Sequence, residues 1–247
     1  MSETLSFYPN RNQFNLISAN TGIDEFYDFF NNTSGTPFNV AATAGSAITF
    51  SAIPYLSSCQ LSVTSPAANR RIALTTSDNG FNTPVAPAMV GPYNGSSLQM
   101  RCKLDTVPIA ADLARIKFGF VTDFSITMTT GVSAQADIGW FFFYQSDYSP
   151  NWLCIGNYSN PNTNVILDSG VKVTDADTYL AIVWTKTNCS FLINNNTVAS
   201  PNFPSTASFA AGNSIGVCLE QQANGGNTLN IDAIKFKTEF DTPRTFF

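Results

Sequence analysis

The segment from residue 179 to residue 199 constrains the fold more than any other part of this chain. Apolar and polar side chains alternate in two runs that flank a polar turn at 186–188, and an Asn-rich reversal follows at 194–196. Alternation with a period of two is typical of a β-strand with one buried face. Asn tolerates a positive φ better than most residues do. The segment therefore predicts a β-hairpin whose second strand ends in an Asn-rich reversal.

Similar runs continue along most of the chain and are divided by turns rich in Gly, Pro, Asn and Ser. They cover residues 59–63, 71–76, 98–104, 116–121, 139–144, 152–156, 214–219 and 230–239. Many short strands separated by such turns predict a β-sandwich or a barrel. The only helical candidate, 110–115, is long enough for a short turn of helix. A length of 247 residues is compatible with one all-β domain.

The composition excludes several classes of function. His is absent, which excludes catalysis by Ser–His or Cys–His pairs and metal sites built from histidine. A formal charge of −5 with scattered basic residues argues against nucleic acid as a partner. Three basic pairs are spaced two residues apart, so we expect each pair to project from one strand face into solvent. These pairs are Arg101/Lys103, Arg115/Lys117 and Lys235/Lys237.

The five Cys residues have no CxxC spacing, so they predict neither a zinc site nor a complete set of disulfides. Several of them, including Cys154 and Cys218, lie in apolar runs, where a thiol behaves as a small hydrophobic group. We therefore expect reduced, buried cysteines, in keeping with synthesis in a cytoplasm. No apolar run reaches the ~18 residues that a membrane span needs, and the N-terminus lacks the pattern of a secretory signal.

Several motifs, in their order along the chain, resemble those of concanavalin A-like lectin and glucanase-type domains in phage and prophage structural proteins. They include the opening Asp24-Glu-Phe-Tyr-Asp-Phe-Phe30, the hairpin Gly139-Trp-Phe-Phe-Phe-Tyr144 with Asn151-Trp-Leu-Cys-Ile155, the turn Asp168-Ser-Gly-Val-Lys-Val173 and the strand Leu229-Asn-Ile-Asp-Ala-Ile-Lys-Phe236. The resemblance spans residues 22–240. It implies an all-β, concanavalin A-like jelly-roll β-sandwich with an extended N-terminal arm.

The resemblance also implies a non-enzymatic structural protein of a bacteriophage virion: a capsid decoration, a fibre or spike, or a tail appendage. In this hypothesis residues 1–21 form an assembly arm, 22–240 the sandwich and 241–247 a C-terminal tail. Apolar ends are unfavourable in water, so they are expected to contact other virion proteins or to fold back over the domain's own edge. The candidate contacts are Phe7, Tyr8, Phe14, Phe246 and Phe247. Open sheet edges favour a homo-oligomer, with a trimer as the first hypothesis.

The alternative hypothesis is a glycan-binding adhesin or lectin domain, whose partner would be a host-surface polysaccharide. Aromatic rings can stack on sugars while neighbouring amides form hydrogen bonds. The candidate glycan-binding residues are Tyr144, Tyr148, Asn151 and Tyr158. Trp152 and alternate residues of 140–144 can instead fill the interior of the sandwich, and both interpretations stay open.

A third hypothesis, a glycoside hydrolase, requires two carboxylates on either side of a cleft. The chain has only four Glu residues and lacks the Glu-x-Asp-x-x-Glu strand of glucanase-type enzymes, so no catalytic residue and no cofactor is expected. Calcium could use oxygen ligands from the loops at 157–164 and 175–177. Turn formation by Asn explains these loops without an ion, and no metal site is expected.

Overall fold

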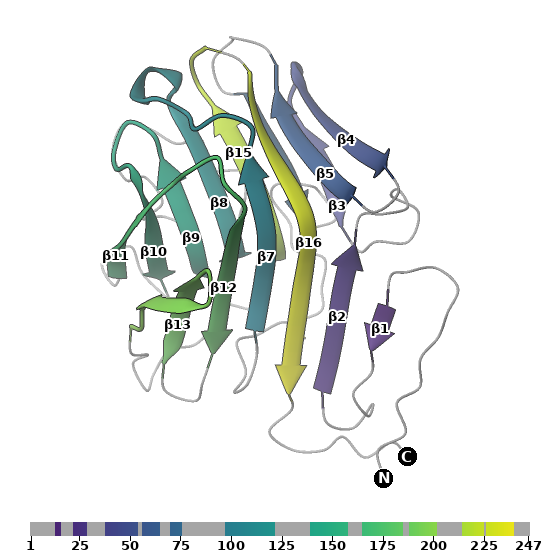
Figure 1. Ribbon diagram of the computed structural model, residues 1–247, viewed down its shortest axis with the longest axis vertical. Helices are drawn as coiled ribbons and strands as arrows, with labels where there is room; N and C mark the ends of the chain where they lie inside the picture. The colour runs from purple at the N-terminus through teal and green to yellow at the C-terminus, as the bar shows by residue number, and fades with distance from the viewer. Residues whose placement is uncertain are drawn as a thin grey trace.

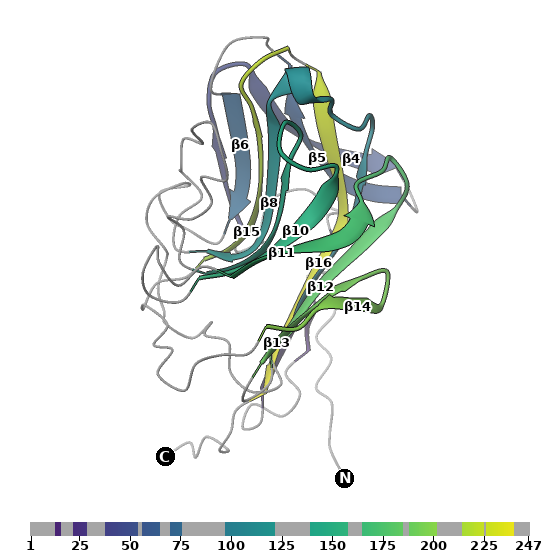
Figure 2. The ribbon, with the colours of Figure 1, turned by 90° about the vertical axis from the view of Figure 1, so that its left-hand side faces the viewer.

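A computed structural model describes residues 13–15, 22–28, 38–53, 56–64, 70–75, 97–121, 139–157, 165–184, 188–201, 214–224 and 226–239. Within these ranges the chain forms two antiparallel β-sheets that pack face to face, as Figures 1 and 2 show. The one helical element of the described residues is a short 3₁₀ turn, Ala110–Asp112. The expected all-β sandwich is confirmed.

The first sheet has nine strands. Seven of them follow one another in the order β1 (Gln13–Asn15), β2 (Gly22–Asp28), β16 (Asn227–Glu239), β7 (Ser97–Leu104), β12 (Thr178–Trp184), β13 (Cys189–Ile193) and β14 (Asn196–Ala199). The other two are β4 (Ser46–Ile53) and β5 (Leu56–Val63), which pair with each other. The long strand β16 pairs with β5 through its first half and with β2 through its second half. It therefore joins both parts of this sheet.

The second sheet has seven strands, in the order β11 (Val165–Lys172), β10 (Asn151–Asn157), β9 (Gly139–Gln145), β8 (Ala114–Val121), β15 (Ser214–Gln221), β6 (Arg70–Thr75) and β3 (Asn39–Ala42). Its central strands β8 and β9 are buried along their whole length. The centre of this sheet is therefore covered on both faces, whereas its edge strand β11 keeps exposed residues. In a simple sandwich the outer face of each sheet is open to solvent.

The core between the sheets is built from large aromatic side chains. The Phe142 ring on β9 lies 5.2 Å from that of Phe191 on β13, and the Phe120 ring on β8 lies 4.5 Å from that of Trp184 on β12. Both pairs are edge-to-face and link one sheet to the other, an arrangement that adds to the stabilisation from burial. Of the two interpretations left open for 140–144, the structure supports filling of the sandwich, because Trp140, Phe142 and Tyr144 all belong to this core.

The hairpin expected over 179–199 is confirmed as β12, β13 and β14. The reversal between β13 and β14 holds Asn194 and Asn195 at φ of 51° and 65°, the left-handed conformation that Asn adopts at low cost. The helical stretch is shorter than expected, because Leu113 has a φ of 50° and Ala114 already begins β8. β1 falls within the range expected to be an arm and pairs with β2. The expected boundaries of arm, body and tail stay predictions.

All five cysteines are free and buried. Burial disfavours the thiolate, and it raises the pKa of Cys59 and Cys102 to about 12. The pKa values of Cys154 and Cys189 are raised by the same cause. A thiol that stays protonated at neutral pH is a poor nucleophile and metal ligand. These residues are therefore core-filling groups, and their expected burial is confirmed.

Two glycines hold β8 and β9 close together. A Cβ added at Gly119 would collide with the backbone oxygen of Trp140, and one added at Gly139 would collide with that of Phe120. Both residues have positive φ, 157° and 150°. Only Gly allows the backbones to approach in this way. The two positions fix β8 and β9 at the centre of the seven-stranded sheet, and β9 leads directly into the pocket described next.

Candidate functional site

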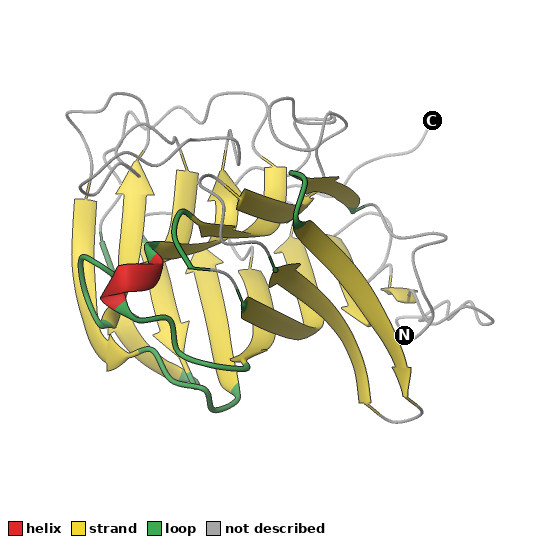
Figure 3. Cartoon of the chain, turned by 90° about the horizontal axis from the view of Figure 1, so that it is seen from above, coloured by secondary structure: helices red, strands yellow, loops and turns green. Residues whose placement is uncertain are grey.

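A pocket of about 280 Å³ lies at the end of the sandwich that carries the 3₁₀ turn. Figure 3 looks down on this end. Three segments distant in sequence form it: the β7–β8 connection, the β9–β10 turn and the end of β11. The lining residues are Val107, Pro108, Tyr144, Ser146, Asp147, Tyr148, Ser149, Pro150, Lys172 and Val173.

The inner wall of the pocket is apolar and fixed. Tyr144 is only 2% exposed, and its hydroxyl donates a hydrogen bond to the backbone oxygen of Pro108 at 2.9 Å. Burial raises the pKa of Tyr144 to about 12, with a smaller contribution from Asp112, so its hydroxyl remains a donor. Val173 is buried beside it. Tyr144 thus supports the β7–β8 connection from below and is not an exposed stacking surface.

Tyr148 stands at the rim of the pocket and is 55% exposed. Its backbone is held in a tight turn, because the N–H groups of Tyr148 and Ser149 both donate to the backbone oxygen of Gln145, at 3.0 and 3.1 Å. The side chain of Ser146 accepts a hydrogen bond from the N–H of Ala114 at 2.9 Å, which ties the turn to β8. The result is an exposed aromatic ring on a rigid base.

A hydrogen-bond network around Asp168 holds the opposite side of the turn. This carboxylate accepts from the Gly170 N–H at 2.7 Å, the Asn151 amide at 2.9 Å and the Ser149 hydroxyl at 3.3 Å. The Gly170 bond is the largest of the influences that lower the pKa of Asp168. The Val173 N–H donates to the Pro150 oxygen at 2.9 Å, which joins the end of β11 to the same turn.

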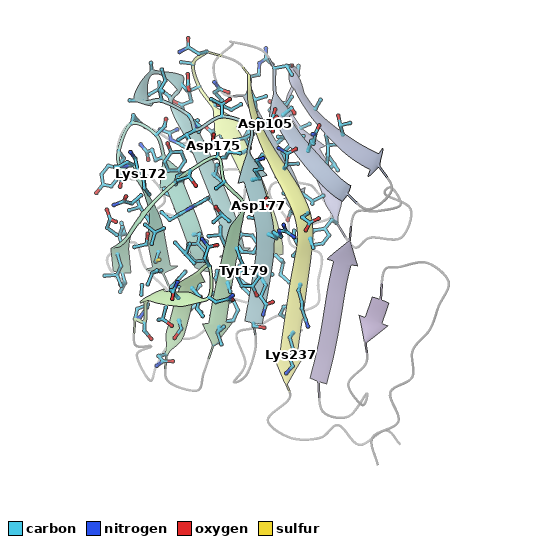
Figure 4. All side chains as sticks on the ribbon, in the orientation of Figure 1. Asp105, Lys172, Asp175, Asp177, Tyr179 and Lys237 are labelled. Carbon is cyan, nitrogen blue, oxygen red and sulfur yellow. The ribbon has the colours of Figure 1, made fainter. Side chains whose placement is uncertain are left out.

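Two charged groups complete the pocket, Asp147 on the β9–β10 turn and Lys172 at the end of β11. Both are exposed. In Figure 4, Lys172 lies on the side of the sandwich formed by β10 and β11. Together with Tyr148, they supply a carboxylate, an ammonium and a hydroxyl that can contact a bound polar molecule.

The four candidate glycan-binding residues differ in their position and exposure. Tyr148 lines the pocket and is exposed, whereas Tyr144 belongs to the core and forms the inner wall. Asn151 is half-buried and supports the turn through Asp168. Tyr158 lies outside the described residues, and Trp152 is a core residue. The sequence did not predict Asp147, Lys172 or Pro108 as residues of this site. Lys172 reaches the turn because β11 pairs with β10, with Lys172 opposite Asn151.

The candidate assembly contacts cannot be placed in the same way. Phe7, Tyr8, Phe246 and Phe247 lie outside the described residues, and for Phe14 only the backbone, in β1, is described. Their expected contacts stay predictions.

A second polar feature lies on the outer face of the seven-stranded sheet. Strand register places Arg71, Glu220, Arg115 and Gln145 side by side on four neighbouring strands. The Arg115 guanidinium lies 3.5 Å from the Glu220 carboxylate, and each side chain is 1% exposed. Burial raises the pKa of Glu220 and lowers that of Arg115, so desolvation outweighs the mutual attraction of the pair. The expectation of a solvated Arg115/Lys117 pair is wrong, because both side chains are buried and the outer face is covered around β8.

No metal centre is found in the part of the chain that the structure describes, because no three His, Cys, Asp or Glu residues gather there. Of the two acidic residues in the 175–177 loop, Asp177 lies 3.1 Å from Arg101 in an exposed ion pair. Residues 158–164 of the other candidate calcium loop lie outside the described ranges. The described residues include no helix long and apolar enough to cross a bilayer.

The fold has known relatives in structure, although no protein-family model and no curated protein sequence matches the chain. The carbohydrate recognition domain of Emp47p matches with a TM-score of 0.55 and 10% identity, over 89% of this chain and 97% of that one. The exoplasmic/lumenal domain of VIP36 in its Ca²⁺/Man2-bound form matches with a TM-score of 0.54 and 10% identity, over 88% of each chain. A β-glucanase of Bacillus licheniformis matches with a TM-score of 0.54 and 12% identity, over 86% of this chain and 97% of the enzyme.

These likenesses define the class of fold, the concanavalin A-like sandwich shared by lectins and glucanases. At identities of 10–12% they define the architecture alone. The function has to be argued from the site.

Proposed function

We propose that this chain is a non-enzymatic, glycan-binding β-sandwich domain and that the pocket beside Tyr148 is its binding site. The observation that carries the proposal is the ring of Tyr148, 55% exposed at the rim of a preformed pocket. A sugar presents an apolar face of C–H groups that packs on such a ring, and hydroxyls that need hydrogen-bond partners at its edge. Asp147 and Lys172 lie in the same pocket as those partners.

The dimensions of the pocket agree with this ligand. Its volume of about 280 Å³ is at the small end for binding sites, which suits a terminal sugar ring better than a long chain. The base of the pocket is held in place by two hydrogen bonds, from the Tyr144 hydroxyl to the Pro108 oxygen and from the Val173 N–H to the Pro150 oxygen. A preformed pocket loses little conformational entropy on binding, so weak contacts with a sugar are sufficient for measurable affinity.

The placement of carboxylates on the seven-stranded sheet supports a role without hydrolysis. Among the described residues on its outer face, Glu220 on β15 and Asp168 on β11 are separated by four strand spacings, or roughly 19 Å. Glycosidases place their two carboxylates about 5–10 Å apart. Glu220 is also paired with Arg115 and buried, and neither carboxylate lines the pocket beside Tyr148.

The test is a glycan array probed with the whole chain and with Tyr148→Ala. We expect the wild type to bind a defined group of glycans and the variant to bind them about two- to tenfold less tightly, since a ring contact contributes ~0.5–1.5 kcal/mol. Tyr148→Phe keeps the ring and should retain most of the binding. Leu167→Ala removes an apolar side chain 37% exposed on β11, outside the pocket, and should bind like the wild type. If Tyr148→Ala binds the same glycans as tightly as the wild type, the pocket beside Tyr148 is not the binding site.

We further propose that this domain works as part of a virion. The resemblance of its motifs to phage structural proteins favours a subunit of a virion appendage, where attachment to a host polysaccharide would use the same pocket. In this setting the chain assembles with other virion proteins and with copies of itself. Mass spectrometry of purified particles would test it, with the chain expected among the structural proteins and its absence counting against the virion role.

A further inference from the structure

We propose that the pocket prefers an acidic sugar and that Lys172 binds the carboxylate of that sugar. This inference rests on the proposed function, because it names the class of glycan that the same pocket takes. It starts from a charged group that the fold brings to the pocket, although Lys172 is distant in sequence from the other lining segments.

The position of Lys172 is fixed by its neighbours. Register pairs it with Asn151, and the following residue, Val173, is buried and bonded to Pro150. Because side chains alternate along an extended chain, the burial of Val173 directs Lys172 outward, toward the rim. Lys172 is exposed and forms no ion pair or hydrogen bond with any residue that the structure describes. Its three N–H donors are therefore available to a ligand.

Asp168 on the same strand and Asp147 in the pocket lining form no ion pair with this ammonium. Asp168 already accepts three hydrogen bonds, from Gly170, Asn151 and Ser149. Asp147 belongs to the β9–β10 turn and follows Ser146, whose N–H donates to the Ala114 oxygen and whose hydroxyl accepts from the Ala114 N–H at the start of β8. Asp147 therefore lies at the β8 side of the pocket, whereas Lys172 belongs to β11. The positive charge at the β11 side of the pocket therefore has no fixed counter-ion among the described residues.

A ligand that spans the pocket meets different chemistry at its two ends. At the β11 side the Lys172 ammonium favours a carboxylate, and at the β8 side Asp147 favours hydroxyl donors and repels a second acid group. A uronic or sialic acid carries one carboxylate and several hydroxyls on one ring, which matches this arrangement. A neutral sugar leaves the charge of Lys172 without a partner.

Titration calorimetry with matched glycosides tests the inference. The pairs are methyl glucuronide with methyl glucoside, methyl galacturonide with methyl galactoside, and methyl N-acetylneuraminide with its carboxamide. In at least one pair we expect the wild type to bind the acid about two- to fivefold more tightly, as an exposed ion pair would give. The preference should shrink as salt is raised from about 0.05 to 0.5 M. Lys172→Met should abolish it and keep binding of the neutral member, whereas Lys103→Met, an exposed change on β7, should preserve it.

Failure of the role of Lys172 and failure of the glycan-binding pocket would give different results. Equal affinity within every pair, or an acid preference that survives Lys172→Met, would overturn the role of Lys172 and leave a pocket for neutral sugars. Absence of binding to all six probes, or binding unaffected by Tyr148→Ala, would overturn the proposed site itself and the inference with it.

Discussion

Glu220→Ala should lower the free energy of unfolding by about 3–5 kcal/mol, because it removes the carboxylate from a buried ion pair. Glu220 and Arg115 lie 3.5 Å apart and are each 1% exposed. One oxygen of Glu220 also accepts from the Gln222 amide at 3.2 Å. In the variant the guanidinium stays in the covered face of the seven-stranded sheet without this carboxylate, and water cannot easily replace it there.

Two further variants make this prediction specific. Replacing both partners with apolar residues, Arg115→Met with Glu220→Leu, should cost far less than Glu220→Ala, since both desolvation penalties disappear together. Asp177→Ala breaks an ion pair whose side chains are 56% and 62% exposed, and it should change stability by less than about 1 kcal/mol. Urea denaturation measures all three. A loss below about 1 kcal/mol for Glu220→Ala would mean that water reaches this face.

Phe142→Ala should also destabilise the protein by about 3–5 kcal/mol, through the loss of apolar contact and the cavity it leaves. Phe142 is fully buried at the centre of β9. Its ring packs edge-to-face against Phe191 of the other sheet at 5.2 Å and against Trp152 of β10 at 6.3 Å. The substitution therefore removes a contact between the sheets and one within the seven-stranded sheet.

The control for this change is Phe142→Leu, which keeps most of the volume and should cost less than about 1.5 kcal/mol. In urea denaturation the midpoint should fall in both variants while the slope stays constant, because the surface exposed on unfolding changes little. A destabilisation by Phe142→Ala as small as that of the leucine variant would show that the two sheets do not share this core.

The strands were predictable because their signal is local. Alternation marks one face of each strand, so the hairpin at 179–199 followed from the sequence. The same pattern put Trp140, Phe142 and Tyr144 on one face but left open whether they fill the core, as they do in the structure. The same spacing put Arg115 and Lys117 on one face of β8. It could not show that this face is covered, since burial of an outer face depends on contacts that spacing along a strand does not encode. A solvated pair was therefore expected where the structure has a buried one.

The candidate site was predictable only in its local part. The β9–β10 turn brought Tyr148 and Asn151 together in sequence, and the exposed ring of Tyr148 lies in the pocket. Lys172 joins them through antiparallel pairing that shifts register between Asn151 and Leu153. Such an irregularity changes which residues face each other and leaves no pattern in a single sequence. Pro108 is held at the pocket by a hydrogen bond from the Tyr144 hydroxyl to its backbone oxygen, a contact between residues distant in the sequence.

Binding of a glycan in the pocket at the β9–β10 turn is tested most directly by the chemical shifts of backbone amides during a titration. With a glycan selected on the array, the account predicts saturable shifts confined to residues 146–151, 172–173 and the 107–109 segment, with the glycan unchanged during the experiment. Shifts centred on Glu220 and Lys117, or cleavage of the glycan, would contradict it.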